Sequence, residues 1–339
     1  MSGPSQFMHS DDAFKVAARM GLQMGKPNTE VFAETLLTLA RADRSVLAVT
    51  SDSRGSGKLT AFAKELPEQI VEVGIAEQNL VGVSAGLASA GMNVFAVSPA
   101  CFLTARSLEQ IKNDVAYSDQ PVTLVGISAG VSYGALGTTH HSLHDFAALR
   151  AINNIVVVAP ADNFETRAAV LAAASSKIPV YLRFGKAAVF SLPGAENPFS
   201  FGMARVIQEG RDVAFVATGE TVIHALLAAA SLSETAGLDC RVVSVPTVKP
   251  LDTEAILAAG RECRAVVTVE EHMVNGGLGE ACAAVLAQAG VPCALQIVGI
   301  PDEYTFTGSQ AEIFRHYGIS MEGLAATAAS LRRRAGPAS

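Results

Sequence analysis

Short apolar runs alternate with helical segments along almost the whole chain, which leaves few folds open to it. The expected strands, rich in Val, Ile, Leu and Ala, are residues 45–52, 69–75, 93–98, 122–128, 155–160, 179–184, 212–217, 241–245, 265–270 and 294–300. The expected helices are residues 29–43, 76–90, 100–117, 163–176, 220–236, 252–259, 279–289 and 308–317. Strands that are apolar at nearly every position and separated by helices indicate α/β structure, with mostly parallel sheets covered on both faces.

The stretch SLPGAENPFSF, at residues 191–201, interrupts this alternation with two Pro, a Gly and no periodicity. A length of 339 residues also fits two domains, at roughly 150 residues for each. We therefore expect a polar leader over 1–27, a first α/β domain over 28–190, a linker over 191–205 and a second α/β domain over 206–335.

Charge is scarce, at 17% of residues against about 25% in typical domains, so we expect large buried areas in the sheets or against another subunit. A formal charge of −7 and the lack of a basic run argue against nucleic acid as a partner. Residues 78–105 carry no charge at all, and this stretch exceeds the ~20 residues that cross a bilayer. A turn at Gly91 and a break at Pro99 exclude a continuous helix, so no membrane span is expected.

The five cysteines are scattered, with no pair and no metal-ligand spacing, as is typical of thiols in a reducing compartment. The N-terminal residues lack the pattern of a secretory signal, so we expect a cytoplasmic protein. Gly277-Leu278-Gly279 is too far from its strand for a dinucleotide-binding turn, and we interpret it as a closely packed helix N-terminus.

Three histidines, His140, His141 and His144, follow a flexible glycine-rich loop. Because loops at the carboxyl ends of parallel strands commonly bind ligands, at least one of them is a candidate ligand-binding or catalytic residue. A metal site needs a third ligand on the same face, which the spacing does not supply, so no metal ligand is assigned.

Glu77 stands where an expected strand leads into the long uncharged stretch. A Glu in the first helical turn can simply oppose the helix dipole. That role does not require apolar surroundings, however. A carboxyl group in an apolar pocket keeps its proton more readily and can donate a hydrogen bond, which makes Glu77 a candidate acid–base group.

Several motifs in order resemble one known family. GIAEQN, PACFLTARSLEQI and GALGTTHHSLHDFAALRAINNIVVVAPAD resemble the pyrimidine-binding domain of transketolases, and VPTVKPLD and VVTVEEHMVNGGLGEA resemble their C-terminal domain. The likeness runs from about residue 28 to about residue 331, in the domain order of the family. The 1-deoxyxylulose-5-phosphate synthases and the β subunits of 2-oxo acid dehydrogenases share this half of the molecule.

The resemblance implies a divided enzyme. Transketolases also have a domain that binds the diphosphate of thiamine diphosphate through Mg²⁺, marked by a GDG motif, and this sequence contains no GDG. It implies the small subunit of a split transketolase, which transfers a two-carbon ketol unit from a ketose, or its phosphate, to an aldose. A large subunit would supply the diphosphate and Mg²⁺ site, and α2β2 assembly is expected.

The resemblance also implies roles for individual residues. Glu77 matches the glutamate that hydrogen-bonds the aminopyrimidine N1′ and thereby promotes deprotonation of the cofactor, and His140 matches a histidine that faces the substrate hydroxyls and the reacting centre. Phe102 matches the aromatic residue that stacks on the pyrimidine, with Asp52, Ile75 and Arg106 as further cofactor-binding candidates. The candidates for substrate binding are Ser56, Ser128, His140 and Arg183, with Ser56 and Arg183 at positions that hold a sugar phosphate.

Four positions depart from the family. Leu136 replaces an aspartate that reads a substrate hydroxyl, Ser128 a substrate-binding histidine, and Thr29 an arginine that binds phosphate, while Ala105 stands where a second aromatic residue is common. These departures predict an altered donor or acceptor, such as a modified or differently charged sugar.

Three alternatives accompany the transketolase hypothesis. The chain could be a 2-oxo acid dehydrogenase β subunit or part of an enzyme like the deoxyxylulose-phosphate synthases, or it could be a non-catalytic interaction subunit. The stretch LRAINNIVVVAPADNFET is more similar to transketolases than to the dehydrogenase subunits. The presence of Glu77, Phe102 and His140 argues against a non-catalytic role.

Overall fold

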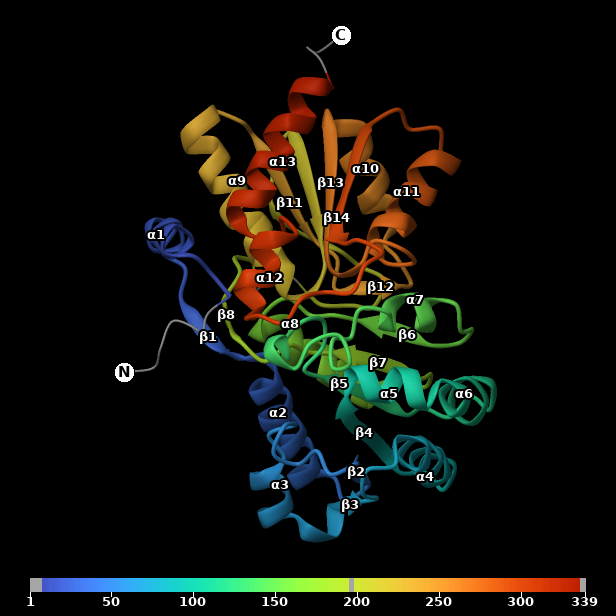
Figure 1. Ribbon diagram of the computed structural model, residues 1–339. Helices are drawn as coiled ribbons and strands as arrows, with labels where there is room; N and C mark the ends of the chain where they lie inside the picture. The colour runs from blue at the N-terminus through green and yellow to red at the C-terminus, as the bar shows by residue number, and fades with distance from the viewer. Residues whose placement is uncertain (1–7, 195–197, 336–339) are drawn as a thin grey trace.

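A computed structural model describes residues 8–194 and 198–335 of the chain. It contains two α/β domains, one above the other in Figure 1, each built on a mostly parallel sheet with helices on both faces. The two-domain α/β architecture that the alternation predicts is therefore confirmed.

The first domain is built on a seven-stranded sheet with the order β12-β6-β7-β5-β4-β2-β3. Its strands are β2 (Val46–Thr50), β3 (Ile70–Glu72), β4 (Asn93–Pro99), β5 (Thr123–Ile127), β6 (Val156–Val158), β7 (Val180–Arg183) and β12 (Thr247–Lys249). One face packs against α2 (Asn28–Ala42), α3 (Thr60–Glu65) and α8 (Asn163–Ser175). The other packs against α4 (Glu77–Ser89), α5 (Ala100–Arg106), the π-helical segment η3 (Ile111–Tyr117) and α7 (Asp145–Arg150).

The second domain has a five-stranded sheet with the order β14-β13-β10-β11-β9. Its strands are β9 (Arg205–Gln208), β10 (Val213–Ala217), β11 (Cys240–Ser244), β13 (Ala265–Met273) and β14 (Ala294–Ile300), of which β9 is antiparallel. On one face lie α9 (Val222–Ala236), α12 (Gln310–His316) and α13 (Met321–Arg334). On the other lie α10 (Thr253–Glu262) and α11 (Leu278–Gln288). Short helical segments are also present: α6 (Leu108–Gln110), η2 (Pro67–Gln69), η4 (Gly134–Leu136) and η5 (Gly219–Thr221).

Strand β12 joins the two domains. It lies in the second half of the sequence but pairs antiparallel with β6, with Thr247 opposite Val158 and Lys249 opposite Val157. The Lys249 side chain donates to the carbonyls of Arg150 and Ile152. The first sheet therefore takes its edge strand from the chain that builds the second domain. Three residues are too few to give a periodic pattern, so the sequence does not predict this strand.

The segment expected to be a leader contains two elements within its described part. Helix α1 (Asp11–Arg19) begins at Ser10, whose hydroxyl accepts from the amide of Ala13. Its buried side chains join the core formed around α9 in the second domain. Strand β1 (Met24–Pro27) then pairs antiparallel with β8 (Ala188–Phe190). Both elements are held by contacts with residues more than a hundred positions away, which explains why local sequence does not predict them.

The uncharged stretch forms α4, β4 and most of α5 in succession. The single helix expected over 100–117 is divided, because α5 ends at Arg106 and a π-helical segment begins at Ile111. The Ser107 hydroxyl, at the break, donates to the Leu103 carbonyl, a contact that bends helices. Among the described residues, no helix is both long enough and apolar enough to cross a membrane.

Candidate functional site

Glu77 is the first residue of α4, and its side chain is only 3% exposed. Ile75, two residues earlier in the loop after β3, is 74% exposed. The loop thus buries a carboxylate and presents an apolar side chain to the outside. Such an arrangement is suited to a ligand or a second chain that covers Ile75 and reaches Glu77.

The Glu77 carboxylate is paired with Arg106. Arg106 Nη1 lies 2.9 Å from Glu77 Oε2, and the guanidinium carbon lies 4.3 Å from the centroid of the Phe102 ring. Phe102 and Arg106 are four residues apart on α5, a spacing that places both side chains on one face of the helix. The sequence suggests purely apolar surroundings for Glu77, but the structure places a charged guanidinium beside it. The two charges that border the uncharged stretch meet each other in space.

His140 lies between two aromatic rings. Its ring meets Phe102 edge to face with centroids 5.2 Å apart, and Tyr133 in the same way at 5.5 Å. Thr139 Oγ1 is 3.0 Å from His140 Nδ1 and so holds the ring orientation. On the other side of Tyr133 is Lys186, whose ammonium lies 4.5 Å from the Tyr133 ring centroid. The sequence does not point to Tyr133 or Lys186, because only the fold brings them beside His140.

The other two histidines of the cluster differ from His140. His141 is buried, with Nδ1 at 2.6 Å from Thr305 Oγ1 and Nε2 at 3.1 Å from the Gly134 carbonyl oxygen, and burial lowers its pKa. It ties the loop to the second domain. His144 lines a hollow of about 630 Å³ together with Phe102, Arg106 and the segment 302–305. Across the described ranges, no three His, Cys, Asp or Glu side chains are placed to hold a metal ion.

Two further candidates lie at the carboxyl ends of strands and have strained backbones. Asp52 follows β2 with a φ of 54°, and its amide donates to Glu72 Oε1. Ser128 follows β5 with a φ of 53°, and its buried hydroxyl has no hydrogen-bond partner in the described part of the chain. Left-handed backbone at non-glycine residues gathers at functional sites. Ser56 lies exposed in the loop after β2.

Arg183, predicted to hold a sugar phosphate, is buried and paired inside the protein. Its side chain is 6% exposed, and Nε donates to Asp145 Oδ2 at 2.8 Å. Nη2 donates to the Glu271 carbonyl oxygen at 2.6 Å, across the domain boundary. Burial raises the pKa of Asp145, but Arg183 and His272 outweigh it, and the net shift is downward. Arg183 therefore joins the two domains.

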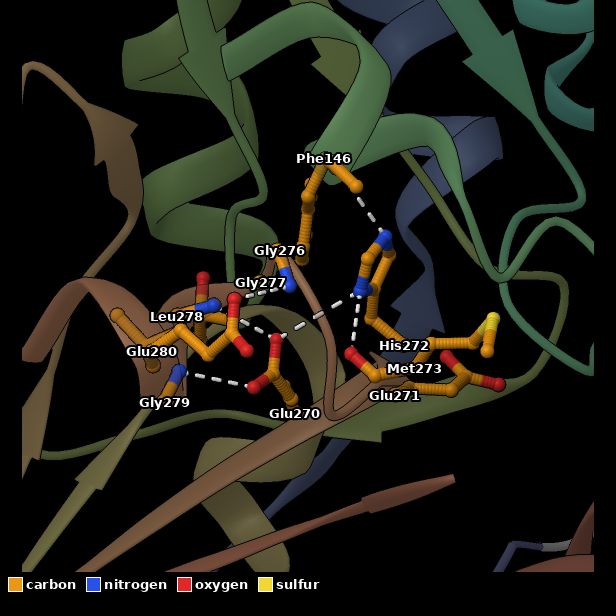
Figure 2. A network of polar contacts seen from close by, with 12 residues as sticks. Phe146, Glu270, Glu271, His272, Met273, Gly276, Gly277, Leu278, Gly279 and Glu280 are labelled. Atoms are coloured by element: carbon orange, nitrogen blue, oxygen red, sulfur yellow. Dashed lines mark hydrogen bonds and ion pairs between the residues drawn. The ribbon is translucent and has the colours of Figure 1, made fainter. Parts of the chain in front are cut away.

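Figure 2 shows the polar network beside this contact, which the sequence does not reveal. Glu270, on β13, accepts hydrogen bonds from the amides of Leu278 at 2.7 Å and Gly279 at 2.8 Å, at the start of α11. Burial raises the pKa of Glu270 to about 7. The carboxylate thus occupies the helix N-terminus that Gly277-Leu278-Gly279 forms, as a phosphate does in nucleotide-binding proteins. The close packing expected for these glycines is present.

His272 fills the space between Glu270 and Phe146 (Figure 2). Its Nδ1 is 2.7 Å from the Met273 carbonyl oxygen, and its ring stacks on Phe146 with centroids 4.9 Å apart. Burial lowers the pKa of His272 to about 4. The motif EEH after an apolar run is the signal that could have marked this group. Its contacts show that it packs the domains together.

Comparisons with known proteins agree with this arrangement. Residues 25–190 match the transketolase pyrimidine-binding domain, and residues 202–324 match the transketolase C-terminal domain. The chain belongs to the transketolase family. Glu77, Phe102 and His140 all lie within the match to the pyrimidine-binding domain, whose family depends on thiamine diphosphate.

Among curated relatives, a subunit of the apulose-4-phosphate transketolase of Phocaeicola vulgatus is 48% identical over 298 residues, which cover 88% of this chain and 95% of the relative. The 1-deoxy-D-xylulose-5-phosphate synthase of Symbiobacterium thermophilum is 38% identical over 98% of this chain but only 51% of its own length. A solved split-gene transketolase, described as an inactive β4 tetramer, is 34% identical with a TM-score of 0.83, covering 91% of this chain and 99% of that one. This chain is thus a transketolase subunit, that is, part of a transferase.

Proposed function

We propose that this chain is the small subunit of a thiamine-diphosphate-dependent transketolase, which transfers a two-carbon ketol unit from a ketose phosphate to an aldose. The observation that carries the proposal is that one side chain, Arg106, contacts both the buried Glu77 carboxylate and the face of Phe102, in the pyrimidine-binding domain of a transketolase subunit.

The pair formed by Glu77 and Phe102 fits an aminopyrimidine. Such a ring is flat, and its N1′ carries an N–H only after it has taken up a proton, so it needs an aromatic face and a carboxyl group that can give and accept that proton. The guanidinium of Arg106, also flat and rich in N–H donors, makes both contacts, at 4.3 Å from the Phe102 centroid and 2.9 Å from Glu77 Oε2. It therefore acts as a stand-in that supports the assignment of the two residues.

The chain's own residues control protonation and orientation. When bound, the cofactor supplies the carbon nucleophile that carries the two-carbon unit. Glu77 would exchange a proton with the pyrimidine ring nitrogen N1′, and Phe102 would hold the ring by stacking. Asp52 and Ile75 remain candidates for cofactor binding, whereas Arg106 occupies the place of the ring. His140, in contact with Phe102, faces the substrate hydroxyls, and Ser56 and Ser128 are its partners in substrate binding.

The sugar that we propose as a substrate is apulose 4-phosphate. The similarity to subunits of apulose-4-phosphate transketolases, at 48% and 37% identity, supports this choice. So do the departures at Thr29, Ser128 and Leu136, which alter positions that read ordinary pentose phosphates in the family.

A separate large subunit completes the enzyme, binds the diphosphate with Mg²⁺ and assembles with this chain as α2β2 in the cytoplasm. The naming of the relatives as transketolase subunits and the inactive β4 tetramer of a split-gene transketolase support this division. The five cysteines, all within the described residues, are free thiols, in keeping with a reducing compartment.

The test is reconstitution. This chain, a large subunit, Mg²⁺ and thiamine diphosphate together should transfer the ketol unit from apulose 4-phosphate to an added aldose acceptor, and neither chain should do so alone. Glu77→Gln should lower kcat by two orders of magnitude or more while the complex still assembles, because a neutral amide cannot exchange the proton. Glu68→Gln, at an exposed position, is the control. Undiminished turnover by Glu77→Gln would remove the assignment of Glu77.

A second candidate follows from the 38% identity to a 1-deoxy-D-xylulose-5-phosphate synthase over nearly the whole chain. The same reconstituted complex can be assayed for formation of 1-deoxy-D-xylulose 5-phosphate. Its formation, with no ketol transfer to an aldose, would favour the synthase reaction over the transketolase reaction.

A further inference from the structure

Arg106 makes the two contacts that the cofactor's pyrimidine ring would make, and its side chain is half in solvent, which leaves it room to move. We propose that Arg106 is an internal competitor for the pyrimidine site, which must leave Glu77 and Phe102 before thiamine diphosphate can bind and which thereby lowers the cofactor affinity. This inference rests on the proposed cofactor dependence and concerns a different property, namely affinity.

The contacts of Arg106 and of an aminopyrimidine exclude each other. The guanidinium stacks 4.3 Å from the Phe102 centroid and donates to Glu77 Oε2 at 2.9 Å. A flat ring held by the same carboxylate and stacked on the same aromatic side chain needs the volume that the guanidinium fills. Close packing leaves no room for both groups.

The energetics favour release of Arg106 rather than movement of Glu77. The Glu77 side chain is 3% exposed, whereas that of Arg106 is 50% exposed. Partly exposed ion pairs and exposed cation–π contacts are weak, so a ligand can displace the arginine at modest cost. Arg106 is also the last residue of α5, where the helix breaks at Ser107. Its long side chain can turn without disturbing the helix.

A released guanidinium has another anionic site within the same hollow. Asp302 and Glu303, on the loop after β14, line that hollow of about 630 Å³ together with Arg106. Glu303 also accepts a hydrogen bond from the Tyr317 hydroxyl at 2.8 Å, which fixes its position. Arg106 therefore alternates between the Glu77–Phe102 pair and the acidic loop of the second domain.

The experiment measures cofactor binding, not turnover. Thiamine diphosphate is titrated by calorimetry into the assembled complex with Mg²⁺, using the wild-type chain, Arg106→Leu, Arg106→Lys and the control Arg44→Leu, whose arginine is 85% exposed. Arg106→Leu should lower the Kd by roughly five- to tenfold. Arg106→Lys, which keeps the charge but loses the flat stacking group, should fall between the two, and Arg44→Leu should equal the wild type.

Equal or weaker binding by Arg106→Leu overturns the inference while leaving the proposed function intact. Failure of the wild-type complex to bind thiamine diphosphate would instead overturn the proposed function. Should Arg106→Leu not assemble, a crystal structure of the wild-type complex with thiamine diphosphate decides: Arg106 turned away from Glu77 supports the inference, and Arg106 still stacked on Phe102 rejects it.

Discussion

Two arginines of the first domain, Arg106 at the end of α5 and Arg183 at the end of β7, have opposite environments. Arg106 has half of its side chain in solvent and an ion pair with Glu77. Arg183 is 6% exposed and is fixed by Asp145 and by the backbone of Glu271 in the other domain. Only an arginine of the first kind can exchange its partner for a ligand, and the second kind serves as a fixed part of the interior.

The fixed role of Arg183 predicts a loss of stability. Arg183→Met should destabilise the chain by about 3–5 kcal/mol, because it leaves the buried carboxylate of Asp145 without its charge partner. Thermal unfolding of the isolated chain measures this, with Arg44→Met as a control expected to change stability by less than about 0.5 kcal/mol. A stable Arg183→Met chain whose complex has a raised KM for the sugar phosphate would contradict the structural role and support the predicted role in substrate binding.

At the scale of elements, the local sequence predicts the helices and strands that depend on neighbouring residues. The apolar strands and the helix that begins at Glu77 follow from composition and periodicity, and the motifs around Phe102 and His140 identify one side of the site. The ion pair of Arg106 with Glu77 could not be predicted, because it depends on the angle between α4 and α5. Strand β12 depends on a pairing between residues about ninety positions apart.

The start of α11 requires a residue without a Cβ atom at position 277. A Cβ at Gly277 would lie 1.8 Å from Glu270 Oε2, although the backbone φ of −89° suits any residue. Gly277→Ala should therefore force the Glu270 carboxylate away from the helix amides and cost about 1–3 kcal/mol.

Chemical or thermal unfolding checks this prediction against Gly86→Ala. A Cβ at Gly86, inside α4, meets no described atom within 4 Å. That variant should be stabilised by about 0.5–1 kcal/mol, because alanine favours a helix interior. If the two substitutions had the same effect, steric contact with Glu270 would not be what requires a glycine at 277.

At the scale of the whole molecule, the two domains meet through buried acidic groups. Glu220, in the second domain, accepts hydrogen bonds from the Asn28 side chain and the Gly185 amide of the first, each at 3.1 Å. Burial, together with the nearby Glu271, raises the pKa of Glu220 to about 8. The interface therefore takes up protons near neutral pH that the unfolded chain would have released.

This gives a pH dependence with a definite sign. The pKa of Glu220 in the folded chain lies above the ordinary value of 4.5. Its contribution to the free energy of unfolding is therefore complete at low pH and is lost as the pH rises through about 8. The part of the stability that Glu220 contributes should fall by about 2 kcal/mol between pH 6.5 and 8.5. Glu270, whose pKa is about 7, adds to this decline, whereas buried histidines such as His9 and His272, whose pKa values are about 4, each oppose it by about 0.4 kcal/mol above pH 6.5.

The unfolding midpoint measured across this range tests the assignment. Glu220→Gln keeps the acceptor that bonds Asn28 and Gly185 but cannot titrate, so it should flatten the decline, and Glu68→Gln, at an 81% exposed side chain, should not. Parallel curves for Glu220→Gln and the wild type would place the titrating group elsewhere.

Strand β12 has a consequence for how genes of this kind can be rearranged. The first sheet ends on residues that the second domain encodes, and the chain before α2 packs on that second domain as well. A recombination event at the linker would give one product without its edge strand and another that carries a strand with nothing to pair. We therefore expect the two domains to remain functional only when they are exchanged as a single unit, although each has a sheet and a core of its own.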